Sequence, residues 1–166
     1  MRRVMTDFHT LYQRYSVDVF RFALYLSRNR SDAEDITSET FVRAWTSPAR
    51  IRTDTVKGYL FTIARNLYLR ELRRSRRNVE LQEPIEDPGV DALAMTEQNA
   101  QLRAVLARLS DLPEVDRSAL LLRAVEGLTY EEIARVLGIS MAAVKTKIHR
   151  ARLAFASIRN RQEGQR

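Results

Sequence analysis

The chain contains no cysteine, so disulfide bonds, thiolate metal ligands and a thiol nucleophile are all excluded. Histidine is nearly absent too, since His9 and His149 are too few for a histidine metal cluster. No apolar run approaches the length of a membrane span, and the first ten residues turn acidic and polar where a signal peptide needs its apolar stretch. We therefore expect a cytoplasmic protein with no cofactor, no metal site and no membrane insertion.

Length and charge narrow the class of protein further. The chain has 166 residues, of which 45% are hydrophobic, enough to form the core of one ordinary domain or of two small ones. Lysine and arginine together number 28 against 21 acidic residues, which gives a net charge of +7. This excess favours a polyanionic partner, either nucleic acid or an acidic protein surface.

An acidic stretch predicts that the chain divides into two domains. Residues 78–96 read NVELQEPIEDPGVDALAMT, with five acidic residues and no lysine or arginine. Pro84, Pro88 and Gly89 disfavour a continuous helix there, so we interpret it as a flexible linker. It is either a solvated tether or an acidic mimic of nucleic acid inside a basic channel. The expected ranges are a first domain at 1–77, the linker at 78–97, a second domain at 98–160 and a tail at 161–166.

Helical spacing of apolar residues predicts three helices in the first domain. The second of them should open on a capping box at Ser31 and Glu34, run to about Trp45 and be followed by a loop from Thr46 to Lys57. The expected buried stripes are Phe8, Leu11, Tyr12, Tyr15, Val19, Phe22 and Leu26; then Ala33, Ile36, Thr37, Phe41 and Ala44; then Leu60, Ile63, Ala64 and Leu67. Polar stripes should remain outside, namely Asp35, Glu39 and Val42 on the second helix and Asn66, Arg70, Arg73 and Arg77 on the third. The basic end of the third helix either binds DNA or complements the helix dipole.

The second domain is also expected to be all helical. One helix should bury Leu102, Val105, Leu106 and Leu109, and the next should have Pro113 in its first turn and end at Gly127. A capping box at Thr129 and Glu132 opens a short helix that ends at Gly138, and Ser140 can cap the last helix. Two helices joined by so short a glycine turn predict a helix-turn-helix. The apolar residues expected between them are Ile133, Ala134, Leu137, Ile139, Val144 and Ile148.

The last helix divides into an apolar face and a basic face. Val144, Ile148, Ala151 and Phe155 should pack, whereas Ala142, Thr146, His149 and Arg150 lie opposite, flanked by Lys145, Lys147 and Arg152. In a helix-turn-helix the start of the second helix enters the major groove, where small residues permit close approach and polar ones reach base edges. The lysines and Arg152 suit phosphate contacts. The alternative is a charged surface helix in a plain bundle.

Three stretches together resemble bacterial sigma factors of the extracytoplasmic-function type, the class that keeps only region two and region four. They are DAEDITSETFVRAW (Asp32 to Trp45), YLFTIARNLYLRELRR (Tyr59 to Arg74) and LPEVDRSALLLRAVEGLTYEEIARVLGISMAAVKTKIHRAR (Leu112 to Arg152). The resemblance implies two small helical domains, core RNA polymerase and promoter DNA as partners, and an anti-sigma factor as a separate regulator. It implies no enzymatic activity.

The resemblance also implies a role for particular residues. Contact with the clamp helices of the polymerase's largest subunit falls to Asp35, Ser38, Glu39 and Val42. Melting and binding of the minus-ten element fall to Arg52, Thr53, Asp54, Thr55, Lys57, Asn66, Arg70, Arg73 and Arg77. Contact with the minus-thirty-five element falls to Ala142, Ala143, Lys145, Thr146, Lys147, His149, Arg150 and Arg152.

Departures from the family pattern leave the promoter sequence open. Ser38 stands where the family usually has glutamine, Arg70 where it often has aspartate, and Lys147 where arginine is common. Because lysine cannot form the bidentate fork of arginine, base preference does not transfer from a relative. A helix-turn-helix regulator that acts without polymerase remains the alternative function. An enzyme such as a recombinase or nuclease is not supported, because the acidic residues show no catalytic or metal-ligand spacing.

Overall fold

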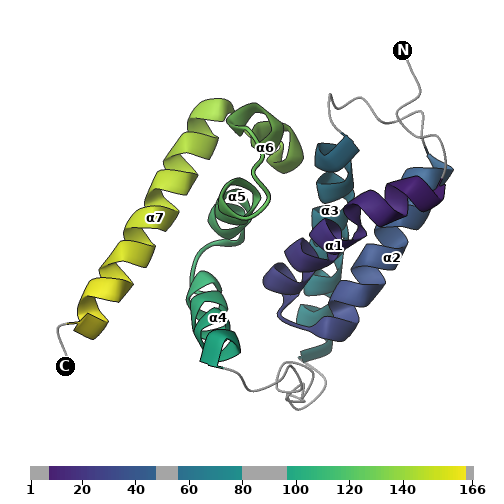
Figure 1. Cartoon of the computed structure of the whole chain (residues 1–166). Coiled ribbons are helices and arrows are strands. Elements are labelled where there is room, and N and C mark those ends of the chain that lie inside the picture. Colours follow the sequence, from purple (N-terminus) through teal and green to yellow (C-terminus); the bar gives the residue numbers. More distant parts are fainter. Residues whose placement is uncertain (1–7, 48–55, 80–96, 164–166) are drawn as a thin grey trace. The chain divides into compact units, whose positions relative to one another are not determined.

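The structure is a computed structural model that describes residues 8–47, 56–79 and 97–163 (Figure 1). Within these ranges the chain forms seven helices and no strand, which confirms the all-α class. The helices are α1 (Phe8–Ser27), α2 (Arg30–Thr46), α3 (Val56–Val79), α4 (Glu97–Leu109), α5 (Glu114–Ala124), α6 (Tyr130–Leu137) and α7 (Met141–Glu163). The chain forms two compact units, which divide after residue 95, so α1–α3 belong to the first and α4–α7 to the second.

Several helices extend beyond the limits expected from the sequence. Helix α3 begins at Val56 and ends at Val79, so Val56 and Lys57 belong to a helix and not to the expected loop. Helix α4 already begins at Glu97, and α7 continues to Glu163, inside the expected tail. The predicted acidic linker lies outside the described residues except at its two ends.

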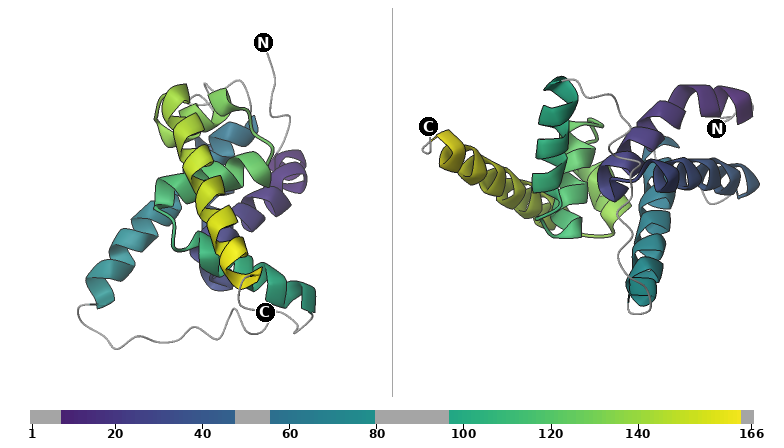
Figure 2. Two further views of the ribbon diagram at one scale, coloured as in Figure 1. Left: turned by 90° about the vertical axis from the view of Figure 1, so that its left-hand side faces the viewer. Right: turned by 90° about the horizontal axis from the view of Figure 1, so that it is seen from below.

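The first unit is a three-helix bundle in which every helix packs on the other two (Figures 1 and 2). Phe22 of α1 and Phe61 of α3 form the centre, with their ring centroids 5.0 Å apart in an edge-to-face arrangement. All five residues expected to pack from α2 are buried. The stripe on α1 is buried only in part, because Phe8 and Tyr12 are 37% and 42% exposed at the open end of the bundle.

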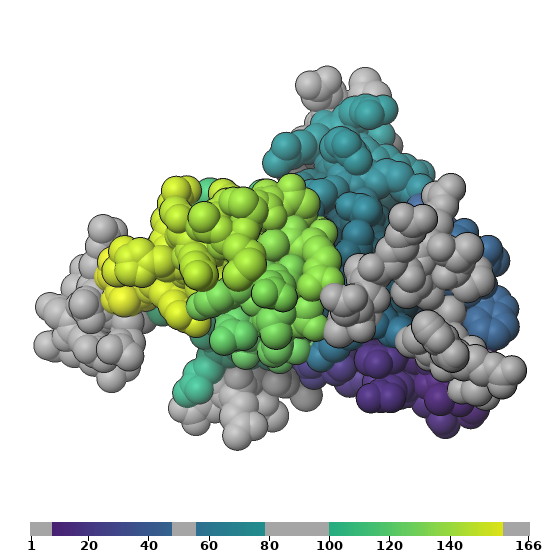
Figure 3. Space-filling model, turned by 90° about the horizontal axis from the view of Figure 1, so that it is seen from above, coloured from purple at the N-terminus to yellow at the C-terminus, as the bar shows by residue number. Residues whose placement is uncertain are grey.

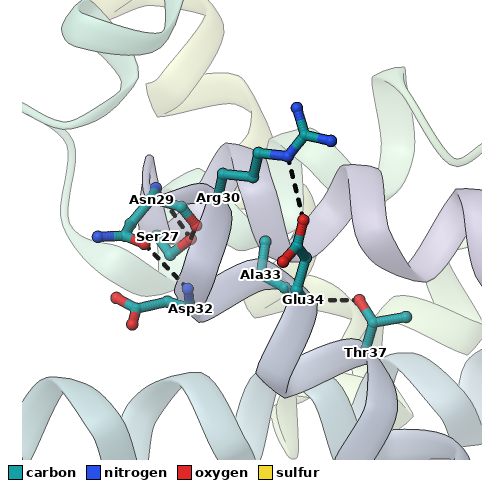
Figure 4. Close-up of polar contacts among 7 residues, drawn as sticks. All are labelled: Ser27, Asn29, Arg30, Asp32, Ala33, Glu34 and Thr37. Atoms are coloured by element: carbon teal, nitrogen blue, oxygen red, sulfur yellow. Dashed lines mark hydrogen bonds and ion pairs between the residues drawn. The ribbon is translucent and has the colours of Figure 1, made fainter. Parts of the chain in front are cut away.

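The beginning of α2 differs from the sequence-based prediction. Asn29, and not Ser31, is the N-cap, and its side-chain oxygen accepts a hydrogen bond from the backbone N–H of Asp32 at 2.9 Å (Figure 4). Glu34 instead accepts a bond from Arg30 at 3.1 Å, one turn earlier on the helix surface. The predicted capping box was therefore wrong by two residues, because asparagine competes with serine for the cap.

Two threonines of α2 are buried in this core, and the hydroxyl groups of both keep a hydrogen bond there. The hydroxyl of Thr37 donates to the carbonyl of Ala33, and that of Thr40 to the carbonyl of Ile36, each at 2.6 Å. Both carbonyls lie one turn earlier in the same helix, so the side chains present only their methyl groups to the neighbouring helices.

In the second unit α5, α6 and α7 pack against one another (Figures 1 and 2). Its core contains Leu122, Ile133, Val144 and Ile148, each no more than 1% exposed. Helix α4 contributes Leu106 and Leu109, but Leu102 and Val105, also expected in the core, are 39% and 38% exposed. Only the end of α4 is therefore packed as the sequence predicts. Ala134, Ile139 and Phe155 are half-buried.

The turn between α6 and α7 is the predicted helix-turn-helix. Thr129 and Glu132 form the predicted capping box, with bonds of 3.1 and 2.8 Å between their side chains and each other's backbone N–H groups. Gly138 ends α6 in the left-handed region, at φ 66°. The hydroxyl of Ser140 accepts a bond from the N–H of Ala143 at 3.1 Å and so caps α7. Pro113 differs slightly from expectation, since it is the N-cap of α5, which ends at Ala124 and not at Gly127.

Candidate functional sites

A groove of about 530 Å³ separates the outer surfaces of α2 and α3. It is lined by all four residues to which the family resemblance assigns polymerase contact, Asp35, Ser38, Glu39 and Val42. The remaining lining residues are Asp32, Ile36, Leu67, Arg70, Glu71 and Arg74. The structure thus brings the four predicted residues together on one face, and it adds a wall from α3 that the sequence pattern did not connect with them.

Both signs of charge meet in this groove. Glu39 is paired with Arg43 one turn along α2, at 2.8 Å, and Glu71 lies 4.0 Å from Arg74 one turn along α3. Pairs this exposed contribute little to stability, so they can open when a partner arrives. Val42, 52% exposed, supplies an apolar surface between them. The groove therefore suits a protein surface with cations facing α2 and some apolar area.

The second half of α3 forms a cationic surface. A hollow of about 350 Å³ is lined by Arg70, Arg73, Arg74 and Arg77, whose side chains all leave the same side of the helix. Asn66, one turn before Arg70, is exposed as well. Arg70 lines both this hollow and the α2–α3 groove, so it belongs geometrically to both predicted sites. Arg77 lies in the last turn, where it also complements the helix dipole.

The predicted minus-ten loop is described only at its end. Arg52, Thr53, Asp54 and Thr55 lie outside the described residues. Lys57 lies in the first turn of α3, where its ammonium nitrogen is 3.5 Å from a carboxylate oxygen of Asp18. A DNA contact by Lys57 would have to replace this ion pair.

Helix α7 presents the predicted basic face to solvent. Its surface is part of the face shown in the space-filling view (Figure 3). The exposed members of the predicted set are Ala142, Lys145, Thr146, His149, Arg150 and Arg152, while Ala143 is half-buried. Lys145 lies over the ring of Tyr130 on α6, with its nitrogen 6.0 Å from the centroid, and Arg123 of α5 lies 4.8 Å from the same centroid.

Lys147 differs from the other cations of this set. Its side chain is only 26% exposed, and its nitrogen lies 3.4 Å from Oδ1 of Asp116, which is completely buried in the first turn of α5. Arg150 lies 3.8 Å from Oδ2 of the same carboxylate. Asp116 is absent from the residues that the sequence pattern singled out. Its three-residue spacing from the buried Ala119 places a charge on the packed face of α5, which was the available signal.

Among the residues that the structure describes, none of the helices combines the length and the hydropathy of a membrane span. In the same ranges, no three histidine, aspartate or glutamate side chains gather as a metal site would require.

Two known protein families match this chain, one in each of its two units. Residues 11–78 match the family described as Sigma-70 region 2, and residues 102–155 match Sigma-70, region 4. The first match covers most of the three-helix unit and the second covers the helix-turn-helix unit.

Individual relatives carry both units. The ECF RNA polymerase sigma factor SigE of Mycolicibacterium smegmatis is 36% identical over 157 residues, which are 89% of this chain and 60% of SigE. SigM of Bacillus subtilis, also named an ECF RNA polymerase sigma factor, is 31% identical over 153 residues, 91% of this chain and 94% of SigM. The solved structure of CnrH in complex with the cytosolic domain of CnrY is similar with a TM-score of 0.70 and 28% identity, covering 92% of this chain and 87% of CnrH. The chain belongs to the family of extracytoplasmic-function sigma factors.

Proposed function

We propose that this chain is an alternative sigma factor, which binds core RNA polymerase and directs promoter-specific initiation of transcription in the cytoplasm. The observation that carries the proposal is the combination, in one chain, of the α2–α3 groove with a helix-turn-helix whose basic face is open. Either feature alone suits many proteins. Their combination suits a protein that joins a large protein partner to a chosen DNA sequence.

The acidic wall of the α2–α3 groove would contact the clamp helices of the polymerase. Asp35 is exposed and has Glu39 one turn further along the same face. Asp35→Lys should therefore abolish association with core polymerase in a pull-down. Glu34→Lys is the matched control, because Glu34 is also exposed but lines the hollow between α1 and α2 and not this groove. Equal loss in both variants would refute the assignment of the groove.

The arginine hollow and Asn66 would hold the melted minus-ten strand, together with the Arg52 to Lys57 segment. Extruding a base costs a few kcal/mol of stacking, which a preformed pocket and a cationic groove can offset. Asn66→Ala should therefore impair initiation from a duplex promoter far more than from a pre-melted bubble. Asn78→Ala, also exposed and on the same helix, should affect neither template. Equal losses on both templates for Asn66→Ala would mean that it does not act in melting.

The basic face of α7 would read the minus-thirty-five element. Ala142 is exposed and Ala143 half-buried at the start of α7, and both are small enough for close approach to the groove floor. Four exposed polar side chains would then reach base edges and phosphates, namely Lys145, Thr146, His149 and Arg150.

Runoff transcription on genomic fragments tests the proposal as a whole. Core polymerase with the chain should yield discrete transcripts, and their start sites would define the promoter. The alternative is a helix-turn-helix regulator that acts without being a polymerase subunit. That alternative predicts DNA binding without comigration of chain and core polymerase in gel filtration, and without new transcripts.

We also propose a separate regulatory protein of the anti-sigma type as a partner. CnrH, whose fold and sequence are similar to this chain, is seen bound to the cytosolic domain of CnrY. Affinity purification of the tagged chain should recover two distinct complexes, one with core polymerase and one with the regulator. Recovery of the regulator and polymerase together in a single complex would contradict the proposal that the chain binds them separately.

A further inference from the structure

One carboxylate in the second unit is fully buried and is approached by two cations of α7. Asp116 has 0% exposure, in the first turn of α5. Lys147 reaches its Oδ1 at 3.4 Å and Arg150 its Oδ2 at 3.8 Å. Removing a carboxylate from water is costly unless positive charge and hydrogen bonds compensate it, so these two cations are what makes the burial of Asp116 tolerable.

The two cations are held very differently. The side chain of Lys147 is 26% exposed and its nitrogen hydrogen-bonds to Oδ1, so its charge is directed into the protein. The side chain of Arg150 is 61% exposed, and its 3.8 Å separation from Oδ2 is too long for a hydrogen bond. Oδ2 accordingly has no hydrogen-bond partner although it is buried. Arg150 is attracted to Asp116 but keeps its donors available for an external acceptor.

We propose that Asp116 is a positioning residue for DNA recognition: it withholds Lys147 from the phosphates and restrains Arg150 beside the reading face of α7. This inference rests on the proposed function, in which α7 lies in the major groove. Phosphate contacts strengthen binding to every sequence alike, whereas base contacts discriminate between sequences. By keeping one lysine out of the phosphate set, Asp116 lowers affinity for DNA in general. By restraining Arg150 beside the reading face, it favours base contacts and so raises the ratio of specific to non-specific binding.

The inference predicts a gain of binding, which a merely structural role would not produce. Asp116→Asn keeps the size of the side chain but removes its charge, so Lys147 is released toward the backbone of DNA. One added phosphate contact steepens the salt dependence of log affinity by about 0.9. Non-specific affinity at about 0.1 M salt should then rise roughly eightfold, since each contact contributes through counterion release. Specific affinity should rise less, because Arg150 also loses its restraint beside the reading face, so discrimination falls.

The test uses the full chain assembled with core polymerase. Its probes are a fluorescent random-sequence duplex and a promoter duplex selected by runoff transcription with the unaltered chain, each titrated at several salt concentrations. Asp111→Asn is the matched control, because it changes the net charge equally at an exposed position of the same unit. It should leave the salt slope and the discrimination unchanged. Adding Lys147→Met to Asp116→Asn should restore the original slope, since the gain is assigned to that lysine.

A second variant keeps the inference testable if Asp116→Asn does not fold. Lys147→Met alone should leave the salt slope on random duplex unchanged, whereas Lys145→Met should lower it by about 0.9. A lowered slope for Lys147→Met, or an unchanged slope for a folded Asp116→Asn, overturns the inference while the proposed function stands. If the unaltered complex binds promoter and random duplex equally, the proposed function fails, and the inference fails with it.

Discussion

Replacing Gly138 tests how the angle between α6 and α7 is encoded. Gly138 has φ 66° and ψ 35°, its N–H bonds to the carbonyl of Ala134, and the N–H of Ile139 bonds to the same carbonyl at 3.1 Å. A Cβ built on Gly138 meets no atom within 4 Å. Gly138→Ala should therefore create no steric clash, and its whole cost should come from holding an L-residue in the left-handed conformation.

The change in unfolding free energy caused by Gly138→Ala is the sum of two opposing contributions. A non-glycine residue in this region costs about 1–2 kcal/mol. Alanine also restricts the unfolded chain, which returns about 0.4–1 kcal/mol. The net loss of unfolding free energy should be about 1 kcal/mol. Gly138→Asn should lose roughly half of that, because asparagine tolerates the left-handed region better than other L-residues.

Native-state amide exchange measures this loss in each unit separately. A loss of about 1 kcal/mol should accelerate exchange of the most protected amides of α6 and α7 roughly fivefold, with those of α1–α3 as the internal control. No acceleration for Gly138→Ala would refute the left-handed geometry of the turn. A loss above about 3 kcal/mol would refute the claim that the site has room for a Cβ. Faster exchange in Gly138→Asn than in Gly138→Ala would refute the backbone explanation itself.

Three further predictions separate neighbouring side chains. Asn29→Ala should destabilise the first unit by about 1 kcal/mol in a denaturant titration, whereas Ser31→Ala should change it by less than about 0.5 kcal/mol, because Asn29 holds the cap. Thr129→Ala should cost the second unit about 1 kcal/mol, seen as faster amide exchange in α6, because it removes one half of the capping box. Arg150→Ala should lose about 1–3 kcal/mol of promoter binding at one base position, whereas Lys145→Ala should weaken all sequences and lower the salt slope by about 0.9. A uniform loss across single-base promoter variants for Arg150→Ala would contradict its place in the groove.

The sequence predicts local features of the fold well where a backbone conformation or a helix cap requires one particular type of residue. Gly138 in the left-handed region and the capping box at Thr129 were both confirmed, since each depends on neighbours within four residues. The start of α2 was predicted wrongly because Asn29 and Ser31 can both cap a helix, and the choice depends on where α1 ends. Helical spacing predicted Leu102 and Val105 to be buried, but spacing cannot show how far a neighbouring helix extends over α4.

The residues predicted to contact polymerase were easier to place from the sequence than the charged residues of α7. Asp35 and Glu39 share a face because they are one turn apart, so the helical period alone brought them together. The wall that faces them belongs to α3, and only packing shows that Arg70 lies across from them. Lys147 was predicted to face DNA because it lies on the flank of a basic helix. Its actual partner is 31 residues earlier in the chain, beyond the reach of any periodicity.

The direction of α7 and the placing of its charged side chains thus depend on different parts of the chain. The direction of α7 depends on the turn immediately before it, where Gly138 and Ser140 satisfy backbone groups of the two helices. The cations Lys147 and Arg150 of α7 are paired with Asp116, which belongs to another helix. Substitutions in the turn should therefore change stability and the affinity for all DNA together, because they move the whole helix. Substitution of Asp116 should, by the role proposed for it above, change the balance between general and specific affinity while α7 keeps its direction. A relative could in this way alter its promoter discrimination without any change in the residues that touch bases.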